Sequence, residues 1–138
     1  YEPQAEIGLN KIHWIETSSS NNWFPTAKEL EDRLKKIGRK KNLIFILNSP
    51  NNPSGAICNN LKDLARIAKK YKLIVLSDEI YTDLSFDNNY KSISEFYPEL
   101  TFISGGLSKW CGAGGWRLGF LAVPNKLKEF MKIDRVFL

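Results

Sequence analysis

Short apolar runs alternate along the chain with segments whose apolar residues recur every three or four positions. Leu43–Leu47 is a continuous apolar run bounded by polar residues, which is typical of a strand buried on both faces. Leu73–Leu76 and Thr101–Ser104 have the same character and predict two further core strands. The pattern also predicts a short β-type run at Ile12–Glu16 and a strand at Leu118–Val123.

Helical signals fill the intervals between these strands. Thr26 and Glu29 fit a capping box, in which each side chain satisfies a backbone donor of the other, and Gly38 marks the end of that helix. Asn60 is predicted to cap a second helix, whose apolar residues between Leu61 and Tyr71 lie on one side.

A last helix is predicted to open at Pro124-Asn125, with Leu127, Phe130 and Met131 on one face. Because strands alternate with helices, we expect an α/β fold of three layers, a mostly parallel central sheet with helices on both faces. The 138 residues fit one domain, 1–138, at roughly 150 residues per domain.

The composition excludes several classes of protein. Hydrophobic residues at 43% and charged residues at 25% exclude a disordered or fibrous chain. The formal net charge of +5 raises the possibility of a nucleic-acid partner, but the positive clusters fall at the ends of predicted helices, where cations favour the helix dipole. We therefore expect solvated helix ends and no nucleic acid. These clusters are Lys35, Lys36, Arg39, Lys40 and Lys41, and Lys69, Lys70 and Lys72.

Neither a metal site nor a membrane segment is predicted. Cys58 and Cys111 are too few for a disulfide framework and lack metal-ligand spacing, and the single histidine, His13, does not supply a zinc ligand set. No apolar run approaches the ~20 residues of a membrane span, and no leader opens the sequence. We expect a cytoplasmic protein that has no contact with a membrane.

Polar loops follow three of the predicted core strands. They are Asn48–Gly55, Ser77–Tyr81 and Ser104–Trp110. Because ligands bind beyond the carboxyl ends of parallel strands, an asparagine, an aspartate–tyrosine pair and a lysine would converge at one sheet edge. A lysine amine can form a Schiff base with a carbonyl cofactor, and pyridoxal phosphate (PLP) also needs an acidic partner for its pyridine nitrogen.

The segments that carry these residues occur in a distinctive order. They are Pro50–Gly55, Ser77–Tyr81, and Ser108-Lys109 followed by Gly115–Gly119. Together they resemble the PLP-dependent class I/II aminotransferases of fold type I, in the family's order and roughly its spacing. The resemblance covers nearly the whole chain, and it implies that the chain is a partial, PLP-binding large domain.

The resemblance implies a catalytic role for three residues. Lys109 would form the Schiff base with PLP and then move a proton between the substrate α-carbon and the cofactor. Asp78 would pair with the pyridinium nitrogen and keep the ring able to accept electrons. Tyr81 would hydrogen-bond the phenolic oxygen of the cofactor.

Further contacts to the cofactor follow from the same resemblance. Asn52 would join Tyr81 at the phenolic oxygen, and Arg117 would clamp the phosphate as a bidentate guanidinium. Ser108 would add a hydroxyl to the phosphate. Gly106 stands where many family members carry a phosphate-binding serine, so that contact is missing or supplied elsewhere. The resemblance also implies a cis Asn52–Pro53 bond.

Arg117 adds a geometric requirement. Asn52, Asp78 and Lys109 follow their strands, whereas Arg117 precedes the strand over 118–123. If all four reach one ligand, this strand must run antiparallel to its neighbours. The connection between Ser104 and this strand carries many glycines and no helical periodicity, so it can allow the reversal.

The implied function is transfer of an amino group between an amino acid and a 2-oxo acid, in a homodimeric enzyme. In the family, other parts of the site lie before Tyr1 and after Leu138, so we expect this chain alone to be incomplete for catalysis. Two alternatives stay open. One is a PLP-dependent lyase of the same fold, and the other is a non-catalytic module that senses PLP or an amino acid.

Overall fold

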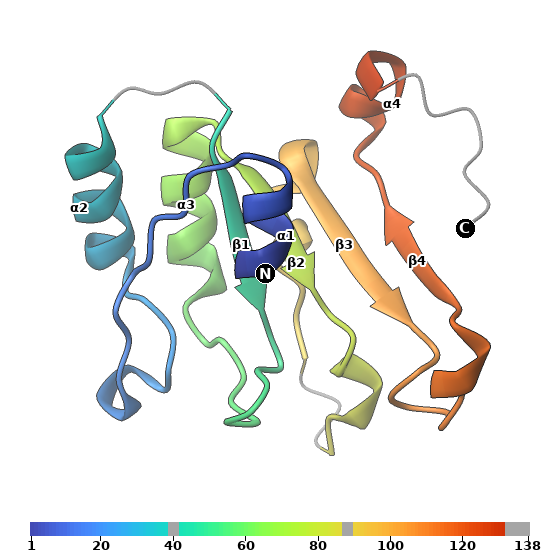
Figure 1. Cartoon of the computed structure of the whole chain (residues 1–138). Coiled ribbons are helices and arrows are strands. Elements are labelled where there is room, and N and C mark those ends of the chain that lie inside the picture. Colours follow the sequence, from blue (N-terminus) through green and yellow to red (C-terminus); the bar gives the residue numbers. More distant parts are fainter. Residues whose placement is uncertain (39–41, 87–89, 132–138) are drawn as a thin grey trace.

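The computed structural model describes residues 1–38, 42–86 and 90–131, and these form one four-stranded sheet in the order β1-β2-β3-β4 (Figure 1). The strands are β1 (Ile44–Asn48), β2 (Ile74–Asp78), β3 (Thr101–Gly106) and β4 (Gly119–Ala122). Both pairings among β1, β2 and β3 are parallel, and β3 pairs with β4 antiparallel. The predicted mostly parallel sheet with one reversed strand is confirmed.

The reversal of β4 fixes which end of it meets the other strands. Gly106 at the end of β3 pairs with Gly119 at the start of β4. The connection contains a single short 3₁₀ turn, η5 (Gly114–Trp116), and Figure 1 shows it at the same edge as the arrowheads of β1 to β3. Arg117, which lies between η5 and β4, is thereby placed at that edge.

Four α-helices accompany the sheet in the part of the chain described here. They are α1 (Glu2–Ile7), α2 (Ala27–Ile37), α3 (Leu61–Tyr71) and α4 (Asn125–Met131). The capping box of α2 is present, because the Glu29 N–H donates to Thr26 Oγ1 at 3.2 Å and the Thr26 N–H donates to the Glu29 carboxylate at 2.7 Å. Gly38 follows α2 with a φ of 77°, a backbone conformation that favours glycine.

The core lies between α3 and one face of the sheet. Leu64 and Ala68 of α3 and Val75 of β2 have no exposed surface, and Leu47 of β1 retains 3%. Helix α2 lies outside α3 in Figure 1 and adds Leu30 and other apolar residues to the same cluster. This packing supplies the hydrophobic free energy that holds the strand ends in register.

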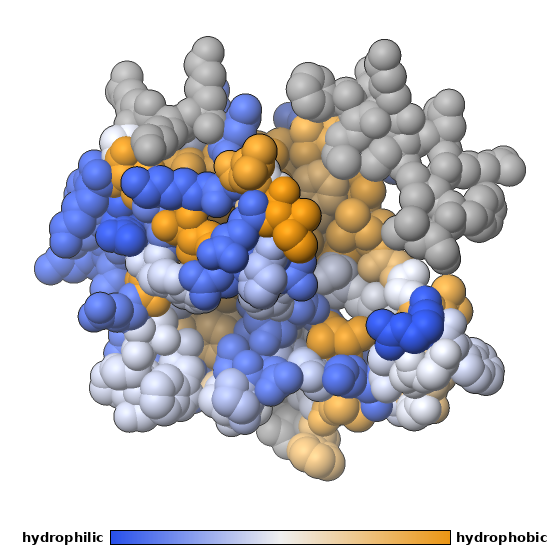
Figure 2. Space-filling model, in the orientation of Figure 1, coloured by the Kyte–Doolittle hydropathy of each residue, from blue (hydrophilic) through white to orange (hydrophobic). Residues whose placement is uncertain are grey.

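The opposite face of the sheet is only partly covered, which corrects the expectation that β1 is buried on both faces. Helix α1 crosses this face (Figure 1), and the Tyr1 hydroxyl that precedes it donates to Asp78. Ile44 and Ile46, which alternate with the core residues of β1, remain 62% and 37% exposed. Helix α1 is short, and none of its residues is buried. Figure 2 shows hydrophobic surface beside it. The three layers are present, with a thin layer on this side.

Two local predictions are wrong. Ile12–Glu16 forms no strand, because within the described residues it enters no ladder with the sheet. Asn60 occupies the N-cap position of α3 without capping it, since its side-chain amide donates to the Pro25 carbonyl at 2.9 Å and its oxygen accepts from the Cys58 thiol at 3.1 Å. The side chain is thus committed to other partners.

The basic clusters behave as solvated helix ends where the structure describes them. Lys70 reaches Glu31 at 2.5 Å and Lys69 reaches Glu99 at 3.2 Å, and these lysines lie in the last turn of α3. These two glutamates, both half-buried, compete with any phosphate for the lysine amines. Arg39, Lys40 and Lys41, as well as the side chains of Phe130 and Met131, lie outside the described residues.

We expect Thr26→Ala to lower the free energy of unfolding by about 1 kcal/mol, because it removes the oxygen that accepts the N–H of Glu29. Urea unfolding measures the change. Thr26→Ser keeps the hydroxyl and is the matched control, expected to stay close to the original. Equal loss in both variants would show that the methyl group, not the cap, stabilises this end of α2.

Candidate functional site

Three residues from three different loops meet at the carboxyl edge of the sheet. The Asn52 side-chain amide donates to the Tyr81 hydroxyl at 3.0 Å, across 29 positions of sequence. The Lys109 amine lies 5.4 Å from the centroid of the Tyr81 ring, within the range of a cation–π contact. Tyr81 is thus the centre of the group, with the amide at its hydroxyl and the amine over its face.

The loop that carries Asn52 is ordered by its own side chains. Asn48, the last residue of β1, accepts the Asn52 N–H on its side-chain oxygen at 3.0 Å, and its amide donates to the Asp78 carbonyl at 3.3 Å. The Asn52–Pro53 bond is cis, as predicted, and Ser49–Pro50 is cis as well. The asparagines that turn chemistry favours here therefore also tie the loop to the end of β2.

Asp78 ends β2 and turns its side chain to the face that α1 crosses. One carboxylate oxygen accepts from Ser104 Oγ at 3.3 Å and from the Ile80 N–H at 3.4 Å, and the other accepts from the Tyr1 hydroxyl. An ionised carboxylate offers about four acceptor positions, so the group can take a further donor. Asp78 is therefore fitted to hold a cationic ring N–H.

Tyr1 is a contact that the sequence pattern did not indicate. Burial raises the pKa of its hydroxyl well above the usual range, and the hydrogen bond and charge of Asp78 raise it further. Tyr1 thus remains a proton donor to Asp78 throughout the neutral range. No local signal could have found this pair, because the contact joins residues 77 positions apart.

Arg117 and Ser108 are brought to the same edge by the β3–β4 connection. Arg117 has a φ of 52°, in the left-handed region that is costly for residues other than glycine, and its guanidinium donates to the Gly114 carbonyl at 2.9 Å. Ser108 is half-buried, and its carbonyl lies 3.8 Å from where a Cβ on Gly114 would stand. For these two residues the structure supports a shared position at the sheet edge.

A side chain at Gly106 would be crowded by the neighbouring strand. A Cβ there would lie 2.9 Å from the Leu118 carbonyl oxygen and 3.3 Å from Ile80 Cδ1. Because β4 approaches β3 closely here, a side chain at this position would require the backbone of β4 to shift. A phosphate at this edge would depend on the arginine and on the neighbouring loop.

Other chemistries find little support among the described residues. Over the ranges 1–38, 42–86 and 90–131, no group of three or more His, Cys, Asp or Glu side chains could hold a metal ion. Burial raises the pKa of the Cys58 thiol to about 11, which keeps it protonated. In the same ranges, no helix has the length and apolar character needed to cross a membrane.

Comparison with known proteins identifies the family of this chain. The family described as aminotransferase class I and II matches residues 3–137, and the chain belongs to this family. The aspartate aminotransferase of Thermotoga maritima is 34% identical over 132 residues, which cover 92% of this chain and 34% of that protein. Aromatic-amino-acid aminotransferase 2 of Thermococcus litoralis is 38% identical over 95% of this chain and 34% of its own length.

The fold agrees as well. The structure of Thermus thermophilus aspartate aminotransferase with maleate matches 95% of this chain and 34% of that protein, with a TM-score of 0.84 and 26% identity. The chain thus spans about a third of the length of these relatives. The family is PLP-dependent, and the predicted fold type I architecture is confirmed.

We expect Asp78→Asn to lower the pKa of Tyr1 toward its ordinary value of about 10, because the variant removes a negative charge that disfavours the phenolate. Alkaline titration of tyrosine absorbance measures this, with each protein compared against a counterpart that also carries Tyr1→Phe. The difference isolates Tyr1 from the other tyrosines. An unchanged Tyr1 titration in the variant would show that the two side chains are not in contact.

Proposed function

We propose that this chain forms part of the PLP site of an aminotransferase that acts on an amino acid and a 2-oxo acid. The observation that carries the proposal is the contact of Lys109 and Asn52 with Tyr81, beside the carboxylate of Asp78. Membership of the family and the aminotransferase names of its relatives support it. A lysine in a glycine-rich loop without these neighbours would not support the proposal of a PLP site.

Each of these residues has a distinct task. PLP supplies an aldehyde that an amine can join as a Schiff base, and a ring that can accept an electron pair. The Lys109 amine would be the group that holds the aldehyde of the cofactor, and it would hold or move a proton at the substrate α-carbon. The Asp78 carboxylate would hold a proton on the ring nitrogen. Tyr81 and Asn52 would donate hydrogen bonds to the phenolic oxygen.

The phosphate is assigned to the β3–β4 connection. Arg117 offers a planar guanidinium suited to bidentate recognition of phosphate, and the left-handed backbone at this residue is the kind of strain found at ligand sites. The Ser108 hydroxyl adds a donor. The assignment of Arg117 depends on the antiparallel β4, which brings the start of that strand to the edge where Lys109 lies.

The remaining features of the protein are proposed on the same basis. We assign residues 1–138 to one domain, a partial large domain that does not catalyse transamination alone, and place the complete protein in the cytoplasm as a homodimer. The chain spans about a third of its relatives' length, so the substrate-selecting residues are sought in the complete protein.

In the complete protein that carries this chain, we expect borohydride reduction after PLP loading to fix the pyridoxyl label on Lys109. Peptide mapping locates the label. Lys109→Ala should lose the label and reduce turnover by at least about 10²-fold, the lower end for removal of a general acid–base group. Lys126→Ala is the matched control and should keep the label on Lys109. A label elsewhere, or none, would refute the assignment.

We expect Asp78→Ala to lower kcat by about 10²-fold or more while PLP affinity falls much less, because the ring nitrogen loses the group that keeps it protonated. Asp78→Glu should retain part of the activity. Steady-state kinetics and PLP titration of the same preparations make the comparison. Equal activity of Asp78→Ala and the original would remove Asp78 from the mechanism.

The same assays separate the alternatives. Transfer of nitrogen from an amino acid to a 2-oxo acid identifies an aminotransferase, whereas elimination from the amino acid without an acceptor identifies a lyase. Bound PLP with neither reaction across a panel of amino acids identifies a sensing module.

A further inference from the structure

Glu79 lies between the two candidate residues Asp78 and Tyr81, and its side chain is bonded away from them. Its carboxylate accepts hydrogen bonds from Ser77 Oγ at 2.9 Å and from Ser92 Oγ at 2.6 Å. Ser77 is 1% exposed and belongs to the core side of β2, since successive residues of a strand point to opposite faces. The Glu79 carboxylate is therefore held on the core side of β2, away from the side chain of Asp78.

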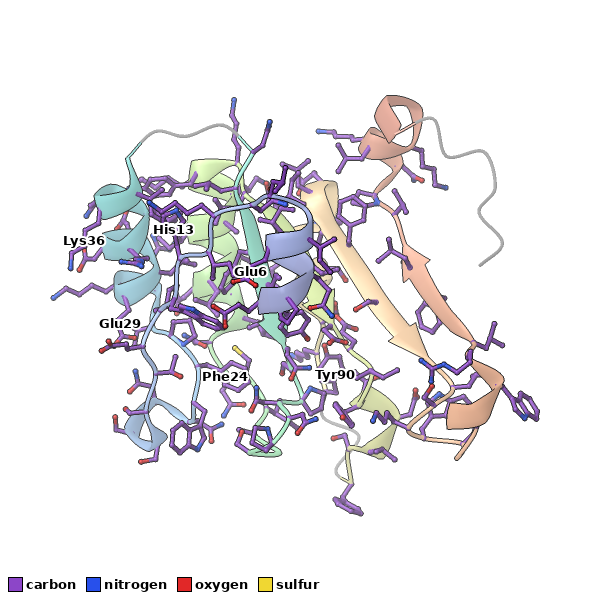
Figure 3. The ribbon with its side chains drawn as sticks, in the orientation of Figure 1. Glu6, His13, Phe24, Glu29, Lys36 and Tyr90 are labelled. Atoms are coloured by element: carbon purple, nitrogen blue, oxygen red, sulfur yellow. The ribbon has the colours of Figure 1, made fainter. Side chains whose placement is uncertain are left out.

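A third hydroxyl joins the same carboxylate. Tyr90 hydrogen-bonds to Glu79, and burial, followed by the charge and hydrogen bond of Glu79, raises the pKa of this phenol far above its usual range. Figure 3 shows the labelled Tyr90 at the edge where the strands β1 to β3 end. A half-buried charge is costly unless it is hydrogen-bonded, and three hydroxyl donors offset that cost here.

The main chain of Glu79 makes equally specific contacts. Its N–H donates to the Ser104 carbonyl at 2.9 Å, which extends the pairing of β2 with β3. Its carbonyl accepts from the Thr82 N–H at 3.1 Å and from Thr82 Oγ1 at 3.0 Å, which begins the turn η2 (Thr82–Leu84). Glu79 thus joins β2, β3, η2 and the segment around Ser92 at one point.

We propose that Glu79 is a positioning residue for the cofactor, acting through Asp78 on one side and Tyr81 on the other. This inference rests on the proposed function. With Glu79 anchored to Ser77, Tyr90 and Ser92, the short segment from Asp78 to Tyr81 has one arrangement. Without that anchor, the carboxylate for the ring nitrogen and the hydroxyl for the phenolic oxygen lose their placement together.

The test compares Glu79→Gln with Glu95→Gln in the complete protein. The first variant presents an uncharged amide to the three hydroxyl donors, whereas Glu95 is an exposed residue whose carboxylate accepts the Ser92 N–H at 3.2 Å in the same segment. We expect Glu79→Gln to weaken PLP binding about tenfold, the scale of one charge-assisted hydrogen bond. Glu95→Gln should remain within about twofold of the original, because an exposed bond contributes little.

Two further readouts distinguish positioning from a general loss of stability. In the protein without PLP, amide hydrogen exchange over residues 78–82 should speed up in Glu79→Gln and stay unchanged in Glu95→Gln. In the PLP-loaded protein, the pH midpoint of the visible absorbance should move only in Glu79→Gln, because the proposed Tyr81 contact is to the phenolic oxygen that shares the proton of the Schiff-base nitrogen. If Glu79→Gln does not fold, Ser92→Ala and Tyr90→Phe each remove one donor and should give smaller shifts of both readouts.

The outcomes separate this inference from the proposed function. If the original protein carries its label on Lys109 and Glu79→Gln matches it in affinity, exchange and midpoint, Glu79 has no positioning role. Reduced thermal stability with an unchanged midpoint likewise overturns the inference, since it shows a structural role alone. If the original protein takes no label on Lys109, the proposed function fails, and the exchange comparison still shows whether Glu79 orders the segment.

Discussion

Parallel pairing of β1, β2 and β3 is the constraint on which the rest of this structure depends. It brings the ends of three strands to one edge, so that Asn52, Tyr81 and Lys109 meet although each belongs to a different loop. The core between α3 and the sheet holds that register. The strand β4 runs in the opposite direction. Its antiparallel pairing with β3 brings the start of β4, and Arg117 with it, to the same edge.

The last two residues of β2 point to opposite faces of the sheet and have different hydrogen-bond partners. Ser77 faces the core and bonds to Glu79, while Asp78 faces the side where Tyr1 and Ser104 reach it. The end of β2 thus carries a buried serine on one face and a hydrogen-bonded carboxylate on the other. Neighbouring residues of one strand share a backbone, which is why we propose that the Glu79 contacts help to place the Asp78 carboxylate.

The face of the sheet that α1 crosses keeps part of its apolar surface exposed to water. Ile44 and Ile46 are the apolar residues of a strand suited to burial on both sides, and they stand partly in water. Apolar surface left exposed forfeits roughly 25 cal/mol per Å² of stabilisation. The incomplete cover agrees with a chain that spans about a third of the length of its relatives.

The sequence by itself determined the class of fold, the strands β1 to β4, the capping box of α2 and the residues at the strand ends, because each leaves a local pattern: an apolar run, a helical period or a cap. With the role that the family resemblance gives to Arg117, which precedes its strand, the sequence also predicted the reversal of β4. Only the tertiary structure decided which side chains pair across the fold. Tyr1 reaches Asp78, Tyr90 and Ser92 reach Glu79, and Asn60 bonds to Pro25 instead of capping α3. These contacts join residues that are distant in sequence or depend on competition among partners, and no local pattern encodes them.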